Sequence, residues 1–228
     1  MSKRLIVTID GPSGAGKSTA SKALAARLGY RYLDTGAMYR AFAFLVHLEQ
    51  EKGGEADPES LIGDFQVRFT QQNGETRTFI DARDISEEIR KPYLSMLASE
   101  LSALAFVRKR LTVLQREMGD QGGIVAEGRD MGTVVFPHAQ AKFFLVADLE
   151  ERARRRHKEL CGRGQSVSFQ EVLEDMKKRD DQDSSRQLAP LKPAIDAVKI
   201  DSTGLTPDEV VDAMASIVRK KASQGSGV

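Results

Sequence analysis

The sequence predicts an α/β fold in which helices cover both faces of a five-stranded parallel sheet. Five short runs of the kind found in buried strands recur along the 228 residues, at 5–10, 30–34, 123–127, 142–146 and 197–201. Helical patterns separate most of these runs, and strands that alternate with helices usually pair in parallel. A glycine-rich loop joins the first run to the first helical pattern. The repeated strands, the helices between them and this loop together predict the fold.

The first strand and the first helix flank a phosphate-binding loop. Residues 11–18, GPSGAGKS, fit the spacing G-x-x-x-x-G-K-[ST] without a gap. An apolar strand precedes the loop, and a helical pattern that closes at Gly29 follows it. Such a loop turns its backbone N–H groups toward phosphate oxygens, and the helix N-terminus adds partial positive charge. A tight glycine turn with an incidental lysine is the alternative, but the context on both sides predicts a nucleoside triphosphate site.

This loop supplies the first set of candidate residues. We expect Lys17 to reach the β- and γ-phosphates and the Ser18 hydroxyl to coordinate Mg²⁺. Asp34 and Glu127 end the second and third strands, so they are candidates to hold the metal through water. The predicted ATP-binding set is Gly11, Pro12, Ser13, Gly14, Ala15, Gly16, Lys17, Ser18 and Thr19.

The region between the second and third strands breaks the alternation. Residues 64–81, DFQVRFTQQNGETRTFID, contain two strand-like runs around Asn73-Gly74, which is a strong hairpin signal. Leucines at helical spacing follow at 94–104. We interpret residues 61–103 as a small insertion in a core formed by 1–60 and 104–228, with a short lid near 152–168.

Two helices near the C-terminus are marked by their capping signals. Thr206 is the expected N-cap of the last helix, Pro207 takes its first position and Glu209 completes a capping box. Ser168 and Glu171 predict a second capping box at the start of the preceding helix. Both helices are therefore expected to begin directly after these cap residues.

Two strand ends carry further candidate side chains. In YLDTGAMYRA, 32–41, a small-residue turn after the strand starts a helix that carries Arg40. An arginine there can bind a phosphate with two hydrogen bonds, although a surface arginine would look the same. In IVAEGRDMGTVVFP, 124–137, Arg129 and Asp130 follow Glu127 in a glycine-flanked loop, where they could simply pair with each other. Ligands of such folds bind at the carboxyl ends of strands, where both segments lie.

The segment LEERARRRHKEL, 149–160, places Arg152, Arg155 and Arg156 on one helical face. A charge run of this kind is usually a solvated face. In a phosphoryl-transfer enzyme it is also what a lid presents to the group in transfer. Both interpretations stay open on the sequence.

A second arginine-containing face lies in KKRDDQDSSRQLAPL, 177–191, where Arg179, Asp183 and Arg186 follow one another at helical spacing. A plain salt-bridged helix would look similar. Two arginines around one acid also suit a ribose hydroxyl and a phosphate together. With the phosphate-binding loop, these segments jointly predict a small kinase whose acceptor is itself phosphorylated.

Five segments in order resemble the bacterial cytidylate kinases: IDGPSGAGKST, LDTGAMYRA, AEGRDMGTVVFP, RDDQDSSRQLAPL and DSTGLTPDEVV. The resemblance runs over nearly the whole chain. It implies an adenylate-kinase-like core with an enlarged insertion that binds the nucleoside monophosphate, and phosphoryl transfer from ATP to CMP or dCMP. Thr35 stands where serine is frequent in that family, and Glu127 where aspartate is frequent. Both exchanges keep the functional group.

The resemblance also implies which residues bind the acceptor. Ser99, Arg108 and Asp130 would surround the cytosine, and Arg179 and Asp183 would hold the sugar. The complete CMP-binding set is Thr35, Arg40, Ser99, Arg108, Arg129, Asp130, Arg179, Asp183 and Arg186, and the catalytic set is Lys17, Arg129, Arg152 and Arg156.

Two physical expectations follow from this assignment. Ser99 and Arg108 lie nine residues apart, about half a turn out of phase on a continuous helix, so a break near 103–106 is expected if both touch one base. The Asp130 carboxylate can accept a hydrogen bond from the cytosine 4-amino group, where uracil presents a second acceptor. That mismatch costs roughly 1–3 kcal/mol or more when it is buried.

The composition limits the remaining functions. A formal net charge of +1 gives no general basic field for nucleic acid, and no apolar run is long enough to span a bilayer. The run after Lys3-Arg4 ends at Asp10, too early for a signal peptide. The single cysteine, Cys161, excludes an intramolecular disulfide and a cysteine-rich metal site, which suggests a reducing cytoplasm. We expect a monomer whose partners are ATP and CMP or dCMP, with an unstructured tail at 222–228.

Two alternatives stay open on the sequence alone. The acceptor could be another small molecule, such as UMP, AMP, shikimate or dephospho-coenzyme A. From a different class, the chain could be a nucleotide switch or ATPase module that binds a macromolecule. It lacks the Asn-Lys-x-Asp motif with which a GTPase reads guanine, and it has neither the basic face nor the length of a nucleic-acid motor.

Overall fold

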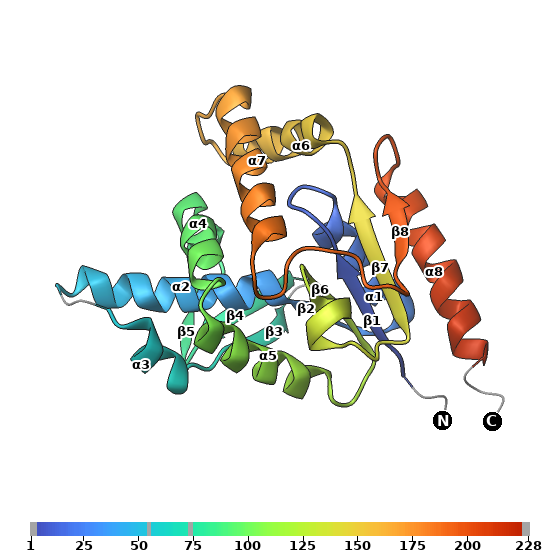
Figure 1. Ribbon diagram of the computed structural model, residues 1–228, viewed down its shortest axis with the longest axis horizontal. Coiled ribbons are helices and arrows are strands. Elements are labelled where there is room, and N and C mark those ends of the chain that lie inside the picture. Colours follow the sequence, from blue (N-terminus) through green and yellow to red (C-terminus); the bar gives the residue numbers. More distant parts are fainter. Residues whose placement is uncertain (1–3, 54–55, 73–74, 225–228) are drawn as a thin grey trace. The chain divides into compact units, whose positions relative to one another are not determined.

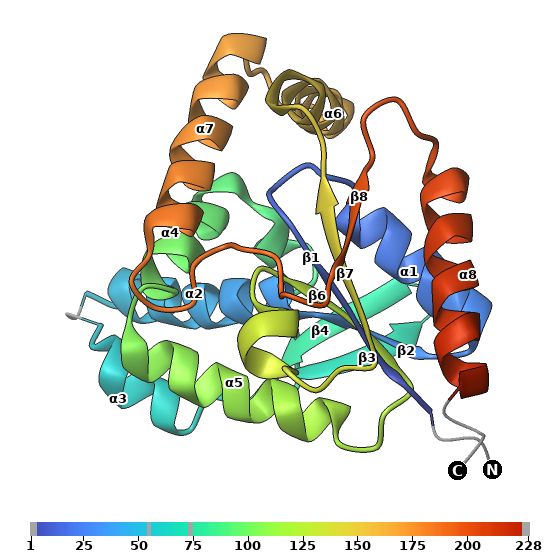
Figure 2. The same cartoon turned by 45° about the vertical axis from the view of Figure 1, so that its right-hand side comes forward.

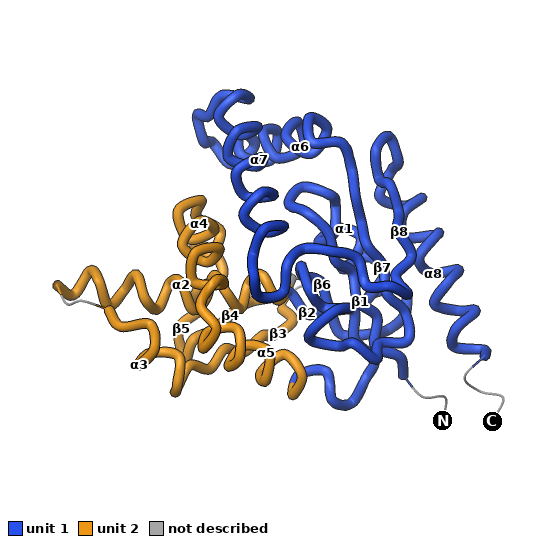
Figure 3. Tube along the Cα trace, viewed as in Figure 1, with its two compact units in different colours: residues 1–34, 118–228 blue, residues 35–117 orange. Residues whose placement is uncertain are grey.

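The computed structural model describes residues 4–53, 56–72 and 75–224 (Figure 1). These residues form two compact units, one from residues up to 34 together with 118 onward and one from residues 35–117 (Figure 3). The predicted Asn73-Gly74 turn and the last four residues of the expected tail lie outside the described residues. The tail residues 222–224 are the last turn of a helix, so the expected lack of structure is wrong for them.

The first unit contains the predicted five-stranded parallel sheet. Its strands are β1 (Ile6–Asp10), β2 (Arg31–Asp34), β6 (Ile124–Gly128), β7 (Ala141–Val146) and β8 (Val198–Asp201). They are ordered β2-β6-β1-β7-β8, and every neighbouring pair is parallel. Each strand agrees with its predicted range to within one residue at either end, so this part of the prediction is confirmed.

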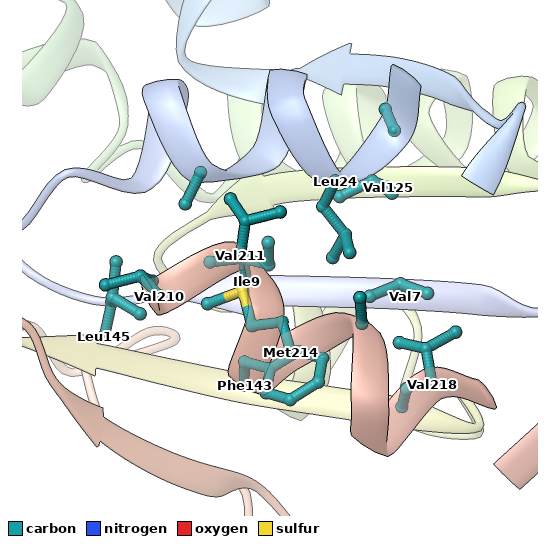
Figure 4. Close-up of a cluster of buried hydrophobic side chains, with 14 of the residues drawn as sticks. Val7, Ile9, Leu24, Val125, Phe143, Leu145, Val210, Val211, Met214 and Val218 are labelled. Carbon is teal, nitrogen blue, oxygen red and sulfur yellow. The ribbon is translucent and has the colours of Figure 1, made fainter. Parts of the chain in front are cut away.

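Helices α1 (Lys17–Leu28) and α8 (Pro207–Gln224) pack together on one face of this sheet (Figure 2). Between helices and sheet lies an apolar core that includes Val7 and Ile9 of β1, Leu24 of α1, Phe143 of β7 and Met214 of α8, all at most 1% exposed (Figure 4). Burying an apolar side chain of this size contributes about 1.5–3 kcal/mol. Because strand residues alternate between faces, Thr8 and Asp10 point to the opposite face.

The opposite face carries η2 (Met131–Val135), a single π-helical turn. A Cβ atom built on Gly132 would lie 3.0 Å from Thr8 Oγ1 and 3.4 Å from Asp10 Oδ2, so this turn packs closely on β1. The sequence prediction did not include it, because one short turn leaves no helical period. The sheet thus has helices on both sides, as expected.

Helices α6 (Leu149–Gly162) and α7 (Phe169–Ser185) pack against each other through a small apolar cluster. Both predicted capping boxes are present. The Ser168 N–H donates to Glu171 Oε2 at 2.8 Å, and the Thr206 N–H donates to Glu209 Oε2 at 2.8 Å. The expected lid near 152–168 falls on most of α6 and on the loop that leads into α7, and its closure stays a prediction.

The second unit begins with helices α2 (Thr35–Glu51) and α3 (Pro58–Gly63). A sheet of β3 (Arg68–Gln72), β4 (Glu75–Ile80) and β5 (Arg83–Asp84) follows, then η1 (Glu88–Arg90), α4 (Pro92–Leu101) and α5 (Ala105–Gly119). Strands β3 and β4 are antiparallel, which confirms the predicted hairpin pairing, and β5 adds a third strand that was not predicted.

This unit contains the whole expected insertion, 61–103, and extends beyond it to residues 35 and 117. The reason is the packing of α2 on α4: Met38, Phe42 and Leu94 are fully buried there, and the Phe42 ring meets the Phe65 ring edge-on at 5.3 Å. Residues 35–60 and 104–117 thus belong to the same compact unit as the expected insertion, and the division into core and insertion stays a prediction.

The expected break between Ser99 and Arg108 is present. Helix α4 ends at Leu101 and α5 begins at Ala105. The Arg108 guanidinium donates to the Ser102 carbonyl at 3.2 Å, and the Ser102 hydroxyl donates to the Ser99 carbonyl at 2.7 Å. Arg108 therefore folds back over the break toward the end of α4. In the described part of the chain, no helix combines the length and apolar character needed to cross a membrane.

Candidate active site

The predicted phosphate-binding loop joins β1 to α1, and two of its glycines are required by close contacts. Gly11 has a φ of +145°, and a Cβ atom there would lie 2.0 Å from the Leu145 carbonyl oxygen of β7. Gly14 has a φ of +74°, and a Cβ atom there would lie 3.0 Å from the Arg152 carbonyl oxygen of α6. Both positions combine a left-handed backbone with backbone oxygen nearby, so any larger residue would displace the loop.

Lys17 lies folded over this loop. Its side chain is buried, and Nζ donates to the Pro12 carbonyl at 2.6 Å. Burial lowers the pKa of Lys17 well below its ordinary value, and the positive charge of Arg129 lowers it further, while Glu127 opposes the shift. A bound polyphosphate would supply negative charge beside this amine and favour its ammonium form.

Glu127 gathers the polar groups at the end of β6. Its Oε1 accepts hydrogen bonds from the Ser18 hydroxyl and the Tyr32 hydroxyl, each at 2.7 Å. Burial raises the pKa of Glu127, as does the nearby Asp34, while Lys17 opposes them. Asp34 is the direct neighbour of Glu127 in the β2–β6 register. Ser18, Asp34 and Glu127 are thus brought together as predicted, and Tyr32 is an addition that the sequence reasoning missed.

These oxygen donors fit Mg²⁺. A protein hydroxyl with one or two carboxylates, completed by water and substrate phosphates, is the usual environment of Mg²⁺ in nucleotide enzymes. Within the described ranges, no three His, Cys, Asp or Glu side chains gather into a metal-binding group. An all-protein cage would therefore not form here, whereas a site completed by a nucleotide fits the residues present.

Asp183 of α7 is the centre of a second polar group, which we call the arginine cluster (Arg129, Arg179, Asp183 and Arg186). Arg129 Nε donates to Asp183 Oδ2 at 2.9 Å, and Arg186 Nη2 lies 3.4 Å from Oδ1. Burial raises the pKa of Asp183, but the charges of Arg129, Arg186 and Arg179 outweigh it and hold the pKa below its ordinary value. Three guanidinium groups around one carboxylate leave positive charge in excess, which suits an anionic ligand.

Asp10, at the end of β1, is a buried carboxylate that the sequence reasoning did not assign to the site. Its Oδ1 accepts from the Met131 N–H and its Oδ2 from the Gly132 N–H, both at 2.8 Å. Burial raises the pKa of Asp10 to about 7, although these two hydrogen bonds oppose the shift; Asp130 adds to it and Lys17 opposes it. The signal that pointed to Asp34 and Glu127, an acid that ends a buried strand, applies equally to Asp10.

The predicted catalytic Arg152 is buried and bound on three sides. Its Nη1 donates to the Ser13 carbonyl at 3.1 Å, its Nε donates to the Ala147 carbonyl at 2.9 Å, and Asp180 Oδ2 lies 2.7 Å from Nη1. Arg152 thus ties α6 to the phosphate-binding loop and to α7.

The other two arginines of the predicted face have different partners. Arg155 donates to the Ser202 hydroxyl and carbonyl at 3.2 and 2.8 Å, and the Ser202 hydroxyl donates to the Ala15 carbonyl at 3.1 Å. The predicted catalytic Arg156 donates to Glu159 Oε2 at 2.8 Å on the same helix. In this structure, therefore, Arg152 and Arg155 bind the loop and its surroundings, whereas Arg156 pairs within α6.

The remaining predicted acceptor residues belong to the second unit. Thr35 is the buried first residue of α2, and Arg40 follows one turn later on the same helix. Ser99 lies on α4, and Arg108 on α5 is buried with its guanidinium 5.9 Å from the centre of the Tyr39 ring. Tyr39 was not predicted; an aromatic residue beside Arg40 gives no sequence signal of its own.

Comparisons with known proteins show the family to which the chain belongs. The cytidylate kinase family model matches residues 7–220. A curated cytidylate kinase of Geobacter sulfurreducens is 50% identical over 95% of this chain and 94% of its own length, and cytidylate kinase 1 of Haemophilus influenzae is 43% identical over 95% and 94%. A solved structure of an uncharacterised protein from Eubacterium ventriosum shares the fold, with a TM-score of 0.53 and 13% identity over 95% of this chain and 99% of that one. On the family match and these relatives, the chain belongs to the cytidylate kinase family.

Proposed function

We propose that this protein transfers the γ-phosphoryl group of ATP to CMP and dCMP, giving ADP with CDP or dCDP. Its family membership and relatives at 43–50% identity that carry the name cytidylate kinase support this activity. The observation that carries the proposal is the arginine cluster, because three guanidinium groups around one buried carboxylate lie in the same unit as the phosphate-binding loop. A kinase with an uncharged acceptor would have no use for them.

On the donor side, residues 11–19 surround the ATP phosphates, which accept from Lys17 and from the backbone N–H groups that every residue of the loop except Pro12 carries. The buried Lys17 amine exchanges the Pro12 carbonyl for phosphate oxygens, which favours its charged form. Ser18 and Glu127, with Asp34, would hold Mg²⁺, which neutralises charge on the β- and γ-phosphates when it is bound. The end of β8 at Asp201 and Ser202 lies beside the loop and provides a surface for adenine.

On the acceptor side, Arg40, Arg129 and Arg186 bind the CMP phosphate, with Thr35 at the start of α2. Arg179 and Asp183 hold the sugar, and Ser99, Arg108 and Asp130 surround the cytosine. The bond from Arg129 to Asp183 fixes the guanidinium in place before the acceptor arrives. A pre-oriented arginine lowers the ordering cost of binding a phosphate.

The reaction is a direct, in-line displacement at the γ-phosphorus. An oxygen of the acceptor phosphate forms the new P–O bond, and the bond from the γ-phosphorus to the bridging oxygen of ADP breaks. The attacking phosphate is already ionised at neutral pH, so no general base is required. Lys17, Arg129, Arg152 and Arg156 act by positioning and charge neutralisation, for which Arg152 must leave Asp180 and Arg156 must leave Glu159.

The experiment that tests this function is ADP release from Mg·ATP with CMP, dCMP, UMP, AMP, GMP, shikimate or no acceptor. We expect rapid release with CMP and dCMP, slow release with UMP and almost none without acceptor. Equal rates with and without acceptor would mean an ATPase, and turnover centred on another acceptor would reassign the arginine cluster. We also propose that the protein acts as a cytoplasmic monomer without nucleic acid. Gel filtration with light scattering, run in the presence and absence of oligonucleotides, tests the monomeric state and the lack of nucleic-acid binding.

A further inference from the structure

The hydrogen bonds of Asp10 connect the donor loop to the acceptor loop. Asp10 immediately precedes Gly11, the first residue of the phosphate-binding loop. Its two carboxylate oxygens accept the backbone N–H groups of Met131 and Gly132, which immediately follow Asp130. The two bonded positions lie 121 and 122 residues from Asp10 in the sequence. One side chain therefore joins two loops that bind different substrates in the proposed function.

The two hydrogen bonds of Asp10 take the place of the N-terminal cap of η2. The Asp130 carbonyl accepts from the Val134 N–H at 2.8 Å and from the Val135 N–H at 3.2 Å, so η2 starts from Asp130. The N–H groups of a helix's first residues have no acceptor within the helix, and a side chain usually satisfies them from the preceding residue. Asp130 makes no such bond. Asp10 satisfies both N–H groups from another strand, so the capping of η2 does not depend on the Asp130 side chain.

The support under these bonds is rigid. Gly11 is held against the Leu145 carbonyl of β7, so the backbone that carries Asp10 has little room to shift. On the other side, Gly132 packs against Thr8 of β1. Asp10 is itself buried, so neither of its bonds is exposed to competition from bulk water.

We propose that Asp10 is a positioning residue for nucleobase recognition, which fixes the backbone that carries Asp130 by accepting the N–H groups of Met131 and Gly132. This inference rests on the proposed role of Asp130 in reading the cytosine. Precise recognition requires that the residue which contacts the ligand is itself held in place by hydrogen bonds from supporting residues. Asp10 touches neither substrate; it acts through the direction in which Asp130 points.

The decisive variant is Asp10→Asn. It keeps the shape of the side chain and one oxygen acceptor, but its amide nitrogen faces a backbone N–H, so one hydrogen bond is lost and two donors oppose each other. We expect the ratio of kcat/KM for CMP over that for UMP to fall about tenfold. The fall should come from a raised KM for CMP, while the KM for ATP stays within about twofold of the wild-type value.

Thr8→Val is the matched control. Thr8 lies on the same strand and the same face, is also buried and packs on the same glycine, but among the residues that the structure describes its hydroxyl has no hydrogen-bond partner. Valine has nearly the same shape, so this variant should retain the wild-type ratio. A loss of discrimination in Thr8→Val would show that any change on this face disturbs the loop, and the inference would be withdrawn.

Two further variants make every outcome decisive. Gly132→Ala leaves Asp10 in the sequence but adds a methyl group 3.0 Å from Thr8 Oγ1 and 3.4 Å from Asp10 Oδ2, which pushes η2 away from the Asp10 carboxylate. It should therefore also lower the CMP-to-UMP ratio, and it replaces Asp10→Asn if that protein does not fold. Asp130→Ala tests the underlying proposal. If Asp130→Ala lowers the ratio while a folded Asp10→Asn leaves it unchanged, Asp10 has no positioning role, whatever the result for Gly132→Ala. If Asp130→Ala leaves the ratio unchanged, the proposed base recognition fails and this inference fails with it. If Asp10→Asn raises the KM for ATP as much as the KM for CMP, Asp10 supports the edge of the sheet in general, and the specific role in nucleobase recognition is overturned.

Discussion

The two units of the molecule treat charge in opposite ways. The first unit buries several charged side chains: Asp10 and Glu127 near the carboxyl ends of β1 and β6, Lys17 at the start of α1 and Asp183 on α7. In the described part of the second unit, Arg108 is the one charged side chain that is buried. Ion pairs in this unit are more exposed: in the pair of Arg77 with Asp84, the side chains are 34% and 40% exposed. Burying a charge is costly unless it is paired, so each buried charge indicates either a network or a binding site.

The comparison shows where function is concentrated in each unit. In the first unit, Asp10, Lys17, Glu127 and Asp183 belong to one network that includes Arg129, so changing one of them should affect both stability and turnover. In the described part of the second unit, Arg108 is the one buried charged side chain among exposed ion pairs, and its proposed role is to bind the acceptor, so its change should chiefly affect the acceptor.

Asp183→Asn should produce the largest loss of stability. It leaves Arg129, Arg179 and Arg186 close together without their shared carboxylate, and removing one partner of a buried charge network costs roughly 3–5 kcal/mol. The pKa of Asp183 is held below its ordinary value, so its stabilising contribution is present above that ordinary value and is lost as the pH falls. Urea unfolding of both proteins should show a difference that is largest at neutral pH and shrinks in acid. A constant difference would contradict the lowered pKa.

Lys17→Ala should lose most of the turnover while the fold persists. The buried amine is the cation nearest the loop, and removing one such group from a preorganised site lowers kcat roughly 10²–10³-fold. The measurement is kcat with saturating ATP and CMP, with circular dichroism to verify folding. Lys22→Ala on the same helix, whose amine lies 5.6 Å from the Tyr32 ring centre, is the matched control and should retain activity. Equal losses in both variants would show that the helix, not the amine, was disturbed.

Arg108→Met should act on the acceptor alone. Methionine keeps the buried apolar stem but loses the donors. The binding of CMP should therefore weaken by about 1–3 kcal/mol, which raises the KM for CMP and leaves the KM for ATP unchanged. Arg77→Met in the exposed pair with Asp84 is the control, and surface pairs contribute only about 0–1 kcal/mol. If the two variants behaved alike, the contrast between buried and exposed charge in this unit would have no functional meaning.

Asp10 provides a smaller, pH-dependent effect. Its pKa in the folded protein is about 7, above the ordinary value of 3.8, so the folded state retains its proton over a range where the unfolded state has lost it. Its contribution to stability is therefore complete below about 3.8 and declines as the pH rises toward 7, by at most about 1.4 kcal/mol per pH unit. Asp10→Asn cannot titrate there. Urea unfolding at pH 5 and pH 8 measures the free energy of unfolding of both proteins. The stability of the variant relative to the wild type should be higher at pH 8 than at pH 5; the same relative stability at both pH values would mean that Asp10 has an ordinary pKa.

Much of the fold could be predicted because its signals are local. The β-branched runs gave all five sheet strands, and each capping box lies within four consecutive residues. The break between α4 and α5 has no proline to mark it and followed only from the resemblance, which places Ser99 and Arg108 around one base. Strand β5 is only two residues long, too short for any periodicity.

The candidate site was predicted less completely because its bonds join distant positions. Asp10 meets Met131 across 121 residues, and Tyr32 meets Glu127 across 95. Arg152 was predicted as one of three arginines on a helical face, but no pattern in the sequence indicates that it pairs with Asp180 and the Ser13 carbonyl. Sequence spacing places side chains on one face of one element; it does not reveal which element lies opposite.

Three carbonyl groups of the phosphate-binding loop have one property in common. The Pro12 carbonyl accepts from Lys17, the Ser13 carbonyl from Arg152 and the Ala15 carbonyl from Ser202. A peptide plane whose carbonyl is bound cannot rotate, so the N–H group on its far side keeps its direction. The entropy lost in ordering this loop is thus incurred when the chain folds. In the proposed function Lys17 leaves the Pro12 carbonyl for the nucleotide, whereas the Ser13 and Ala15 carbonyls keep their donors. Nucleotide binding then leaves the backbone of residues 13–15 nearly as it was, and its calorimetric entropy chiefly reports the release of water and the closing of other parts of the chain.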